Sequence, residues 1–424
     1  MSNTTATLRA GDLDTSFDAS AVLGHYLDHR GQDVARVDGD TQLYVALSHA
    51  ATFVVAGLTG DGAALSEFGQ QGVVDGNYGG EEDREDFNSP GQRVVVNDDI
   101  LVVGGMTLLD GGKPFPALSA YSRNGGRLLW QKVLRPEPGK HAYLAALSFT
   151  CNEEQSCPNQ EQSHWASLDR TEQKRLTGEN FDLQVHGEHL YVLASGIIGQ
   201  RRVGALLRLN LQGEFDRGFG LGGLRIVEHP ETGVNLFGLL VLDDAIIVAG
   251  GATDSGKGAF IARLDLQGLP VPDFADSGFR FSGFSGVFYR VAGRSPGLIV
   301  AAGTGGDGSA FGALAMAVDP RSGALAYPLA VLQNNLAAFW GADVDASGRV
   351  VLVGEYFTAQ WRPQMVIARL DVAGRWDNTF GHDGKVDVAV ADSLGESIAV
   401  QPDGRLLVVG YRNEGVPLIL RYHG

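Results

Sequence analysis

One unit recurs along the whole chain, and this repetition constrains the fold more than any other feature. Each copy has an apolar hairpin, a polar turn and an aromatic residue that is usually followed by glycine. The clearest copies lie at residues 260–278 and 365–384, and a third lies at residues 204–223. Tandem units of about 50 residues with several short strands each are typical of β-propellers. The sequence therefore predicts an all-β propeller.

Seven hairpins accompany seven aromatic markers, and this count predicts seven blades. The hairpins span residues 34–47, 93–105, 181–194, 239–251, 291–303, 342–354 and 398–410. The markers are Phe17, Phe68, Trp130, Phe219, Phe274, Tyr327 and Phe380. In each hairpin a strand meets a polar turn and returns rich in valine, leucine and isoleucine. A third strand follows, and a fourth is expected around the marker. Residues 1–424 are thus expected to form one propeller of four-stranded antiparallel blades.

The two ends of the chain suggest how the ring closes. The last copy stops at residues 418–424 after three strands, while residues 11–23 read as a fourth strand without a blade. A strand lent from one terminus to the other would remove an exposed sheet edge. We therefore expect the N-terminal strand to complete blade 7.

Three stretches of the repeat resemble a known family. IAVQPDGRLLVVG begins at Ile398, LILRY begins at Leu418, and GDLDTSF begins at Gly11. These residues resemble the delta-60 repeat family of bacterial β-propeller proteins, best over residues 9–74, 204–278 and 365–424. The resemblance implies a seven-bladed propeller over nearly the whole chain. It implies no catalytic residues, because the family is defined by its scaffold.

Charge limits the classes of partner. The formal net charge is −17, from 33 basic and 50 acidic residues. Such a surface repels phosphate backbones and anionic lipids, which argues against nucleic acid and membrane partners. The alternative is that the charge only keeps the protein soluble. No run of 18 apolar residues occurs, and the first residues lack the basic and apolar pattern of a signal peptide. We expect a monomer that is cytoplasmic, or exported without a conventional signal peptide.

Charged residues that recur at one repeat position are expected to build every blade. Four arginines stand one residue before the end of the third strand's apolar run, and three aspartates stand three residues before the marker. They are Arg208, Arg263, Arg369 and Arg421, and Asp14, Asp216 and Asp377. A catalytic group would be needed once, so the recurrence favours structural pairing within or between blades. Function is expected where the repeat is broken.

The largest break is an insertion at residues 150–180. Its second half is predicted to form a short helix on the loop-rich face, and Trp165 contributes to an apolar stripe there. Cys151 and Cys157 lie close enough in sequence for a disulfide at the base of the insertion, although a reduced pair is the alternative. A metal site with His164 is disfavoured, because no second ligand pair stands at a familiar spacing.

A second break is acidic. Residues 81–86, EEDRED, place five carboxylates in a loop between two blades. They could bind a cation or a basic partner, but a solvated loop is the favoured interpretation.

A third break is aromatic and gives the candidate ligand site. Tyr289 and Trp340 stand at equivalent places in two blades, near the expected mouth of the central channel. Tyr356 and Trp361 follow in a connection between second and third strands. Together with Trp165, these side chains could bind a carbohydrate or protein ligand through apolar faces and edge hydrogen bonds. Packing between blades is the alternative.

Polar residues near the starts of first strands are candidate metal ligands. They are Asn88, Asn180, Asn235 and Glu396. Amide and carboxylate oxygens around a channel mouth would suit a hard cation such as Ca²⁺. Beyond this, no cofactor is expected.

Function remains open between three hypotheses. The chain has no nucleophile elbow, zinc-protease, phosphate-loop or EF-hand motif, and its histidines are scattered. We favour a non-enzymatic recognition scaffold that binds a protein or glycan on the loop-rich face. The alternative is a propeller enzyme, lactonase-like or lyase-like, with a divalent metal at the channel mouth. A lectin with repeated sites is disfavoured, because the loops differ from blade to blade.

Overall fold

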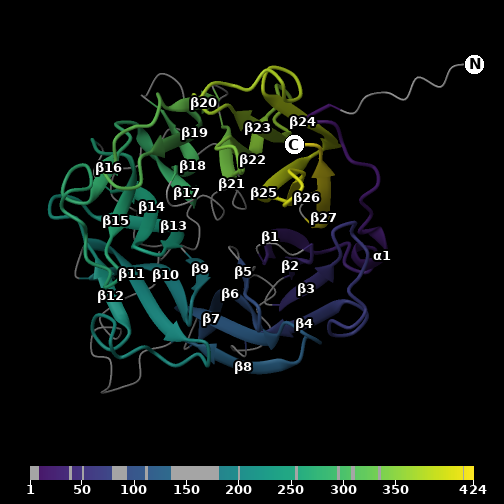
Figure 1. Cartoon of the computed structure of the whole chain (residues 1–424), viewed down its shortest axis with the longest axis horizontal. Helices are drawn as coiled ribbons and strands as arrows, with labels where there is room; N and C mark the ends of the chain where they lie inside the picture. The colour runs from purple at the N-terminus through teal and green to yellow at the C-terminus, as the bar shows by residue number, and fades with distance from the viewer. Residues whose placement is uncertain are drawn as a thin grey trace, which may run out of the picture.

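The computed structural model places seven antiparallel sheets in a ring around one axis (Figure 1). Six sheets have four strands and the last has three. This architecture confirms the predicted seven-bladed β-propeller. The structure describes residues 9–37, 41–49, 52–78, 93–109, 113–134, 181–198, 201–253, 256–293, 297–306, 311–332, 336–413 and 415–424.

The strands divide into blades in chain order. Blade 1 consists of β1 (Arg30–Arg36), β2 (Leu43–His49), β3 (Thr52–Leu58) and β4 (Val73–Asn77). Blade 2 consists of β5 (Arg93–Val96), β6 (Ile100–Leu109), β7 (Lys113–Ser122) and β8 (Leu128–Val133). Blade 3 consists of β9 (Phe181–His186), β10 (His189–Ile198), β11 (Arg201–Asn210) and β12 (Leu224–Val227). Blade 4 consists of β13 (Val234–Leu242), β14 (Ala245–Ala252), β15 (Ala259–Leu264) and β16 (Phe279–Phe281).

The remaining three blades complete the ring. Blade 5 consists of β17 (Ser285–Gly293), β18 (Ile299–Gly306), β19 (Phe311–Val318) and β20 (Ala330–Leu332). Blade 6 consists of β21 (Ala338–Val344), β22 (Val350–Phe357), β23 (Pro363–Leu370) and β24 (Lys385–Ala391). Blade 7 consists of β25 (Ser393–Val400), β26 (Leu406–Arg412) and β27 (Val416–Tyr422).

Within every blade, each strand pairs with its neighbours in sequence. The first strands lie nearest the axis and the fourth strands lie at the rim (Figure 1). The predicted hairpins are the first and second strands. The expectation that a fourth strand surrounds each marker is wrong except for Trp130 in β8. Phe68, Phe219 and Phe380 lie in the turn before the fourth strand, because their fully buried rings fill the space beneath that turn.

The N-terminal segment completes blade 7, although it contributes one bridge rather than a full strand. Leu13 pairs with Tyr422 at the outer edge of β27. The Gly11 N–H donates to the His423 carbonyl at 2.6 Å, and the Asp14 N–H donates to the Arg421 carbonyl at 2.8 Å. The chain then enters the short helix α1 (Ser20–Leu23) beside blade 1 (Figure 1).

The core is divided among the seven interfaces between blades. Each of seven apolar clusters combines buried side chains of two neighbouring blades. Because both faces of a blade are covered, the second strands are continuously apolar instead of alternating. The β14 sequence AIIVAGGA illustrates this, since all but its last residue are buried.

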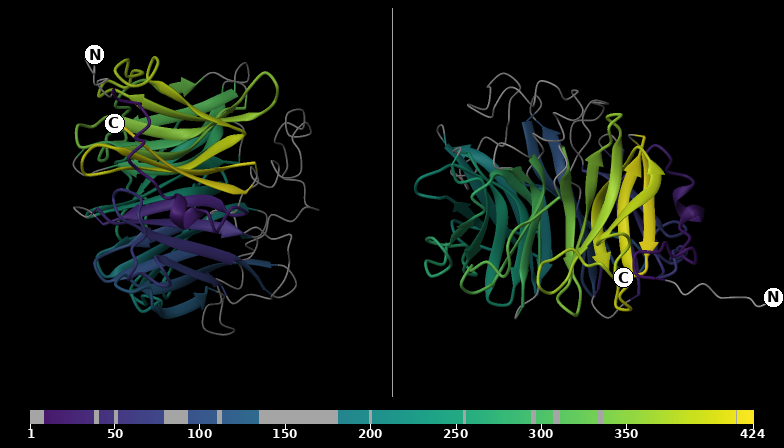
Figure 2. Two further views of the ribbon diagram at one scale, coloured as in Figure 1. Left: turned by 90° about the vertical axis from the view of Figure 1, so that its right-hand side faces the viewer. Right: turned by 90° about the horizontal axis from the view of Figure 1, so that it is seen from above.

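Two kinds of connection open on one face of the ring: those from a fourth strand to the next blade, and those from a second to a third strand. The strands run between this loop-rich face and the opposite face (Figure 2). The insertion at residues 150–180 and the acidic residues 81–86 lie outside the described residues. In the part of the chain that is described, no helix is long and apolar enough to cross a membrane.

Candidate binding face around the ring axis

Five blades carry a β-bulge at the same place in the innermost strand. The strand register skips Gln32 in β1, Phe237 in β13, Tyr289 in β17, Trp340 in β21 and Glu396 in β25. A bulged residue has no partner opposite it, and the bulge redirects its side chain. Each bulge lies near the middle of its strand or in the part closer to the loop-rich face. These five residues, the bulge ring, therefore encircle the axis on the side of that face.

Three consecutive members of the bulge ring are aromatic and in contact. The rings of Phe237 and Tyr289 meet edge to face, with centroids 5.5 Å apart and planes at 90°. The rings of Tyr289 and Trp340 are stacked, with centroids 4.2 Å apart and an angle of 22°. We call these three residues the aromatic arc. Tyr289, in the middle, is only 8% exposed, whereas Phe237 and Trp340 at the two ends are half-buried.

A buried carboxylate fixes the orientation of Trp340. The indole Nε1–H donates to Oε2 of Glu355 at 2.6 Å. Glu355 belongs to β22 and is paired with Ala338 at the start of β21, so the contact joins two strands of blade 6. A charge-assisted bond of this kind holds the indole in one orientation. The two aromatic residues predicted to lie at the axis are thus brought together, and they also pack between blades.

The other predicted aromatic residues lie elsewhere. Trp361 is 68% exposed in the turn after β22, on the loop-rich face, and its backbone has a positive φ of 58°. Tyr356 is half-buried and packs against the apolar cluster between blades 5 and 6. Burial, followed by the nearby Asp387 carboxylate of β24, raises the pKa of Tyr356. Its hydroxyl is therefore associated with the outer strand of the blade.

The structure places two of the four predicted metal ligands. Asn235 lies two residues before Phe237, and its side-chain oxygen accepts a hydrogen bond from Nη1 of Arg202 at 3.3 Å. Glu396 is the bulge residue of blade 7 and is half-buried. These two residues belong to β13 and β25, with β17 and β21 between them in the ring. The remaining predicted residues lie outside the described residues: Asn88, Asn180, Trp165, Cys151 and Cys157.

Next to the bulge ring, on its side away from the loop-rich face, charged side chains meet across the axis. Nη2 of Arg290 from blade 5 lies 2.5 Å from Oδ1 of Asp33 in blade 1 and 3.3 Å from Oγ of Ser397 in blade 7. Nη1 of Arg290 lies 3.4 Å from Oδ1 of Asp182 in blade 3. Arg93 from blade 2 donates to the same Asp182 oxygen at 3.1 Å. We call these five residues the axial network.

The charged side chains of the axial network are largely buried. Asp33 and Asp182 are almost fully buried. Burial opposes the charge on Arg290, but Asp33 and Asp182 outweigh this effect, so that the pKa of Arg290 is raised. The guanidinium thus occupies the axis as a permanent cation.

The same aspartates also bind the backbone of the next blade. Oδ2 of Asp33 accepts the Val94 N–H of β5 at 3.2 Å, and Oδ2 of Asp182 accepts the Leu239 N–H of β13 at 2.8 Å. Asp343 repeats the contact further along β21, where it accepts the Val400 N–H of β25 at 2.8 Å. These bonds fix the spacing of neighbouring first strands, and with it the positions of the bulge residues.

The arginines and aspartates that recur in the repeat are structural, as predicted. Nε donates to Oδ2 at 2.8 Å in three pairs: Arg208–Asp216, Arg369–Asp377 and Arg421–Asp14. In each, the guanidinium lies over the ring of the aromatic marker, Phe219, Phe380 or Phe17. Arg263 differs, since it bonds to Asp244 and to the Pro320 carbonyl.

Two features of this region were not predicted from the sequence. The axial network was not predicted, although its signal is visible as charged residues within apolar first strands, such as Asp33 and Asp182 at one repeat position. The second is a group of Asp28, His29 and His49 on the loop-rich face. His29 and His49 flank the hairpin of residues 34–47, and the register shift at the Gln32 bulge places them opposite each other, next to the Arg30–Ser48 pair.

Known proteins resemble this chain only in their fold. No family model matches the chain. No curated protein matches its sequence closely enough to be a relative. The resemblance to the delta-60 repeat family therefore stays a prediction.

Several solved structures have a similar architecture. The Dos1 propeller is 11% identical, with a TM-score of 0.47 over 92% of this chain and 77% of that chain. The β-propeller domain of the Trilobed protease from Pyrococcus furiosus is 7% identical, with a TM-score of 0.47 over 93% and 96% of the two chains. A glucose dehydrogenase is 12% identical, with a TM-score of 0.40 over 94% and 97%. Propellers host both binding proteins and enzymes, so these neighbours do not assign a function.

Proposed function

We propose that this chain is a non-enzymatic recognition scaffold that binds a glycan or a protein on its loop-rich face. The observation that carries the proposal is the aromatic arc. Phe237, Tyr289 and Trp340 occupy one position on three successive blades, close to the axis and toward that face. The repeat does not require an aromatic residue at the bulge, because blades 1 and 7 carry Gln32 and Glu396 there.

The chemistry of the bulge ring suits amphipathic ligands. The half-buried rings of Phe237 and Trp340 offer apolar surface, while the half-buried Glu396 supplies a carboxylate around the same axis. Sugar rings and peptide segments combine apolar faces with hydroxyl or amide groups, and such a site matches both features. Trp361 adds an exposed aromatic side chain on the same face.

The rival hypothesis of a metal-dependent propeller enzyme receives less support. A divalent cation at the axis would have to lie close to the Arg290 guanidinium, which repels it. The carboxylates Asp33 and Asp182 are already paired with Arg290. We therefore place the ligand above the axial network, against the bulge ring, and propose no reaction.

The first experiment screens labelled full-length protein on glycan and peptide arrays, and then measures the affinity for each ligand that binds. Trp361→Ala is compared with Val372→Ala, because the two side chains are 68% and 67% exposed but lie on opposite faces of the ring. The scaffold hypothesis predicts that only Trp361→Ala weakens binding. Truncation of a contacting aromatic residue typically costs about 1 kcal/mol or more of binding free energy.

A second pair of variants tests the aromatic arc. Phe237→Ala removes one end of the arc, and Trp340→Phe keeps an aromatic ring but removes the N–H that donates to Glu355. Phe237→Ala is expected to weaken binding at least as much as Trp361→Ala, while Trp340→Phe has a smaller effect. The proposal is wrong if a tight ligand binds all four variants with the affinity of the unmodified protein.

A further inference from the structure

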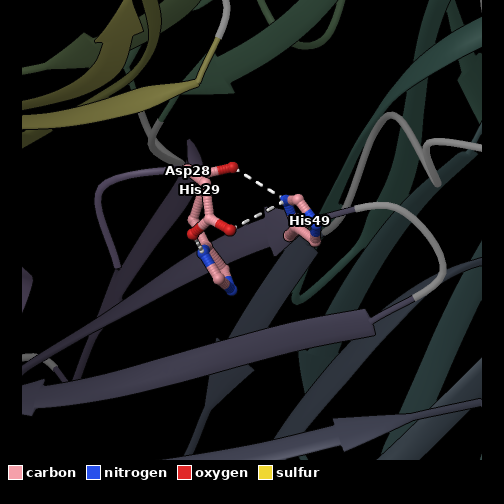
Figure 3. A group of neighbouring side chains, drawn as sticks. All are labelled: Asp28, His29 and His49. Atoms are coloured by element: carbon pink, nitrogen blue, oxygen red, sulfur yellow. Dashed lines mark hydrogen bonds and ion pairs between the residues drawn. The ribbon is translucent and has the colours of Figure 1, made fainter. Parts of the chain in front are cut away.

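A cluster of two histidines and one aspartate stands on the loop-rich face at blade 1 (Figure 3). Asp28 and His29 immediately precede β1, and His49 ends β2. The last ladder pair before the cluster is Arg30 with Ser48, so His29 and His49 lie at the next opposed position of the same two strands. We call Asp28, His29 and His49 the His–Asp cluster.

The carboxylate of Asp28 lies between the two imidazoles (Figure 3). Its Oδ1 is 2.7 Å from Nδ1 of His29, and its Oδ2 is 3.7 Å from Nδ1 of His49. Nδ1 of His49 also donates to the backbone carbonyl of Asp28 at 2.9 Å. The two imidazole rings are 5.1 Å apart with an angle of 32°. One ligand atom from each residue can be chosen so that all three lie within 4.8 Å of one another.

Neighbouring groups keep the cluster in place. Tyr26 packs edge-on against the His29 ring, with centroids 5.2 Å apart. The next residue, Arg30, places its guanidinium 5.1 Å from the centre of the Tyr411 ring of blade 7. The His29 side chain is therefore fixed by packing, whereas His49 is half exposed and Asp28 is exposed. Such an arrangement has one rigid ligand and two that can adjust.

We propose that the His–Asp cluster binds one divalent transition-metal ion, of the kind represented by Zn²⁺, Co²⁺ and Ni²⁺. Nδ1 of His29, Nδ1 of His49 and a carboxylate oxygen of Asp28 are the three protein ligands. The proposal does not rest on the identity of the ligand that binds the aromatic arc.

The donor set selects this class of ion. Imidazole nitrogen suits zinc and its neighbours, whereas calcium and magnesium require oxygen ligands, of which this cluster supplies only those of Asp28. Zinc binds nitrogen and carboxylate oxygen at about 2.0–2.2 Å, so atoms on one ion are at most about 4.4 Å apart. On binding an ion, Oδ1 of Asp28 and Nδ1 of His29, now 2.7 Å apart, must separate, and both Nδ1 atoms must release the protons of their hydrogen bonds to Asp28. The exposed side chains of Asp28 and His49 can supply this movement.

Three protein ligands leave a fourth position open to solvent. Structural zinc sites use four protein ligands, while sites with three retain a position for water or an added ligand. The cluster faces the loop-rich side of the ring, where we place the ligand. An ion here would add a positive charge to a protein whose net charge is −17. It would thus provide an attachment point for an anionic or hydroxyl group.

The experiment uses untagged full-length protein whose two cysteines have been alkylated, so that thiolates contribute no metal binding. Co²⁺ is titrated while its visible absorption is followed, and Zn²⁺ is measured by competition with a chelating dye. The same titrations are made with Asp28→Asn, His29→Ala and His49→Ala. We expect one saturable ion in the unmodified protein and an affinity at least about tenfold weaker in each variant.

His382→Ala is the matched control. Nδ1 of His382 lies 3.3 Å from Oδ2 of Asp383, so it forms a histidine–aspartate pair like that of His29, but without a second histidine. It is expected to bind the ion as tightly as the unmodified protein. Because Asp28 and His49 have exposed or half-exposed side chains, Asp28→Asn and His49→Ala should fold normally even if His29→Ala does not. No saturable binding, or equal binding by Asp28→Asn, His49→Ala and His382→Ala, would overturn the proposal.

Discussion

At the scale of single residues, recurrence separates structural charges from candidate functional groups. The pair Arg421–Asp14 has the same 2.8 Å contact as the pairs in blades 3 and 6, although its members are 407 positions apart in the chain. Asp14 also accepts hydrogen bonds from the backbone N–H and hydroxyl of Ser16. A group that the scaffold needs in several blades is poorly suited to a unique role in binding. The aromatic arc, which three blades have and the others lack, is the opposite case.

The Asp14 carboxylate predicts a pH dependence of stability. Burial would raise its pKa, but the bonds from Ser16 and the guanidinium of Arg421 outweigh burial and lower the pKa to about 2. Because the folded-state pKa lies below the ordinary value of 3.8, the stabilisation is complete above pH 4 and is lost as the pH falls toward 2. Its size is about 2 kcal/mol.

Asp14→Asn isolates this contribution. Urea unfolding of both proteins between pH 7 and pH 2 should show the largest difference in unfolding free energy above pH 4. The difference should narrow steadily below that pH, because protonated Asp14 and asparagine are both neutral. A difference that stayed constant down to pH 2 would mean that Asp14 keeps its charge for another reason.

At the scale of elements, the termini close the ring without a full strand. The Leu13–Tyr422 bridge joins the edge of β27, and Ala19 and Val22 are buried in the cluster between blades 7 and 1. The segment thus covers an edge and also fills an interface. Closing the ring through its two ends makes the first blade and the last depend on each other.

Deletion of residues 1–23 is therefore expected to destabilise the whole protein. The loss includes the buried Arg421–Asp14 pair, and breaking such a pair costs about 3–5 kcal/mol. A variant that begins at residue 9 keeps the bridge, the ion pair and α1. It is expected to have the melting temperature of the full chain. If both shortened proteins melt within a couple of degrees of the full chain, closure by the N-terminal segment does not stabilise the ring.

At the scale of the whole molecule, the axial network links the first strands of blades 1, 2, 3, 5 and 7. Arg290 contacts Asp33, Asp182 and Ser397, which are separated from it in the chain by 257, 108 and 107 positions. It therefore joins distant parts of the ring. The glycines after the bulges of blades 4 and 6 permit close approach here. A Cβ on Gly341 would lie 3.0 Å from Cα of Ser397, and one on Gly238 would lie 2.8 Å from the Val291 nitrogen.

Arg290→Met is expected to be strongly destabilising. It leaves Asp33 buried without its cation and Asp182 with Arg93 alone, and breaking a buried ion pair typically costs about 3–5 kcal/mol. Arg321→Met, at an arginine of the exposed turn that follows β19, is the control and should leave the melting temperature unchanged. Equal melting temperatures of the two variants would show that the axial network does not hold the ring together.

Repetition explains what the sequence alone could and could not predict. The blade count, the hairpins and the Arg–Asp pairs were predictable, because each pattern occurs several times and its copies support one another. Tyr289 and Trp340 were predicted to lie near the axis, because they hold equivalent repeat positions. The axial network was not predicted, since Arg290, Asp33 and Asp182 come from three different blades and meet only when the ring closes. The His–Asp cluster was missed for the same reason, as it depends on strand register.

Hydrogen–deuterium exchange of the protein with and without a ligand from the array screen shows whether recognition occurs at the loop-rich face around the axis. Binding is predicted to slow exchange in residues 234–240, 285–292 and 338–343 and in the turn at residues 357–363. Little change is predicted in the connections between third and fourth strands on the opposite face, such as residues 265–278 and 371–384. Protection confined to those opposite connections would mean that the ligand binds the other face of the ring.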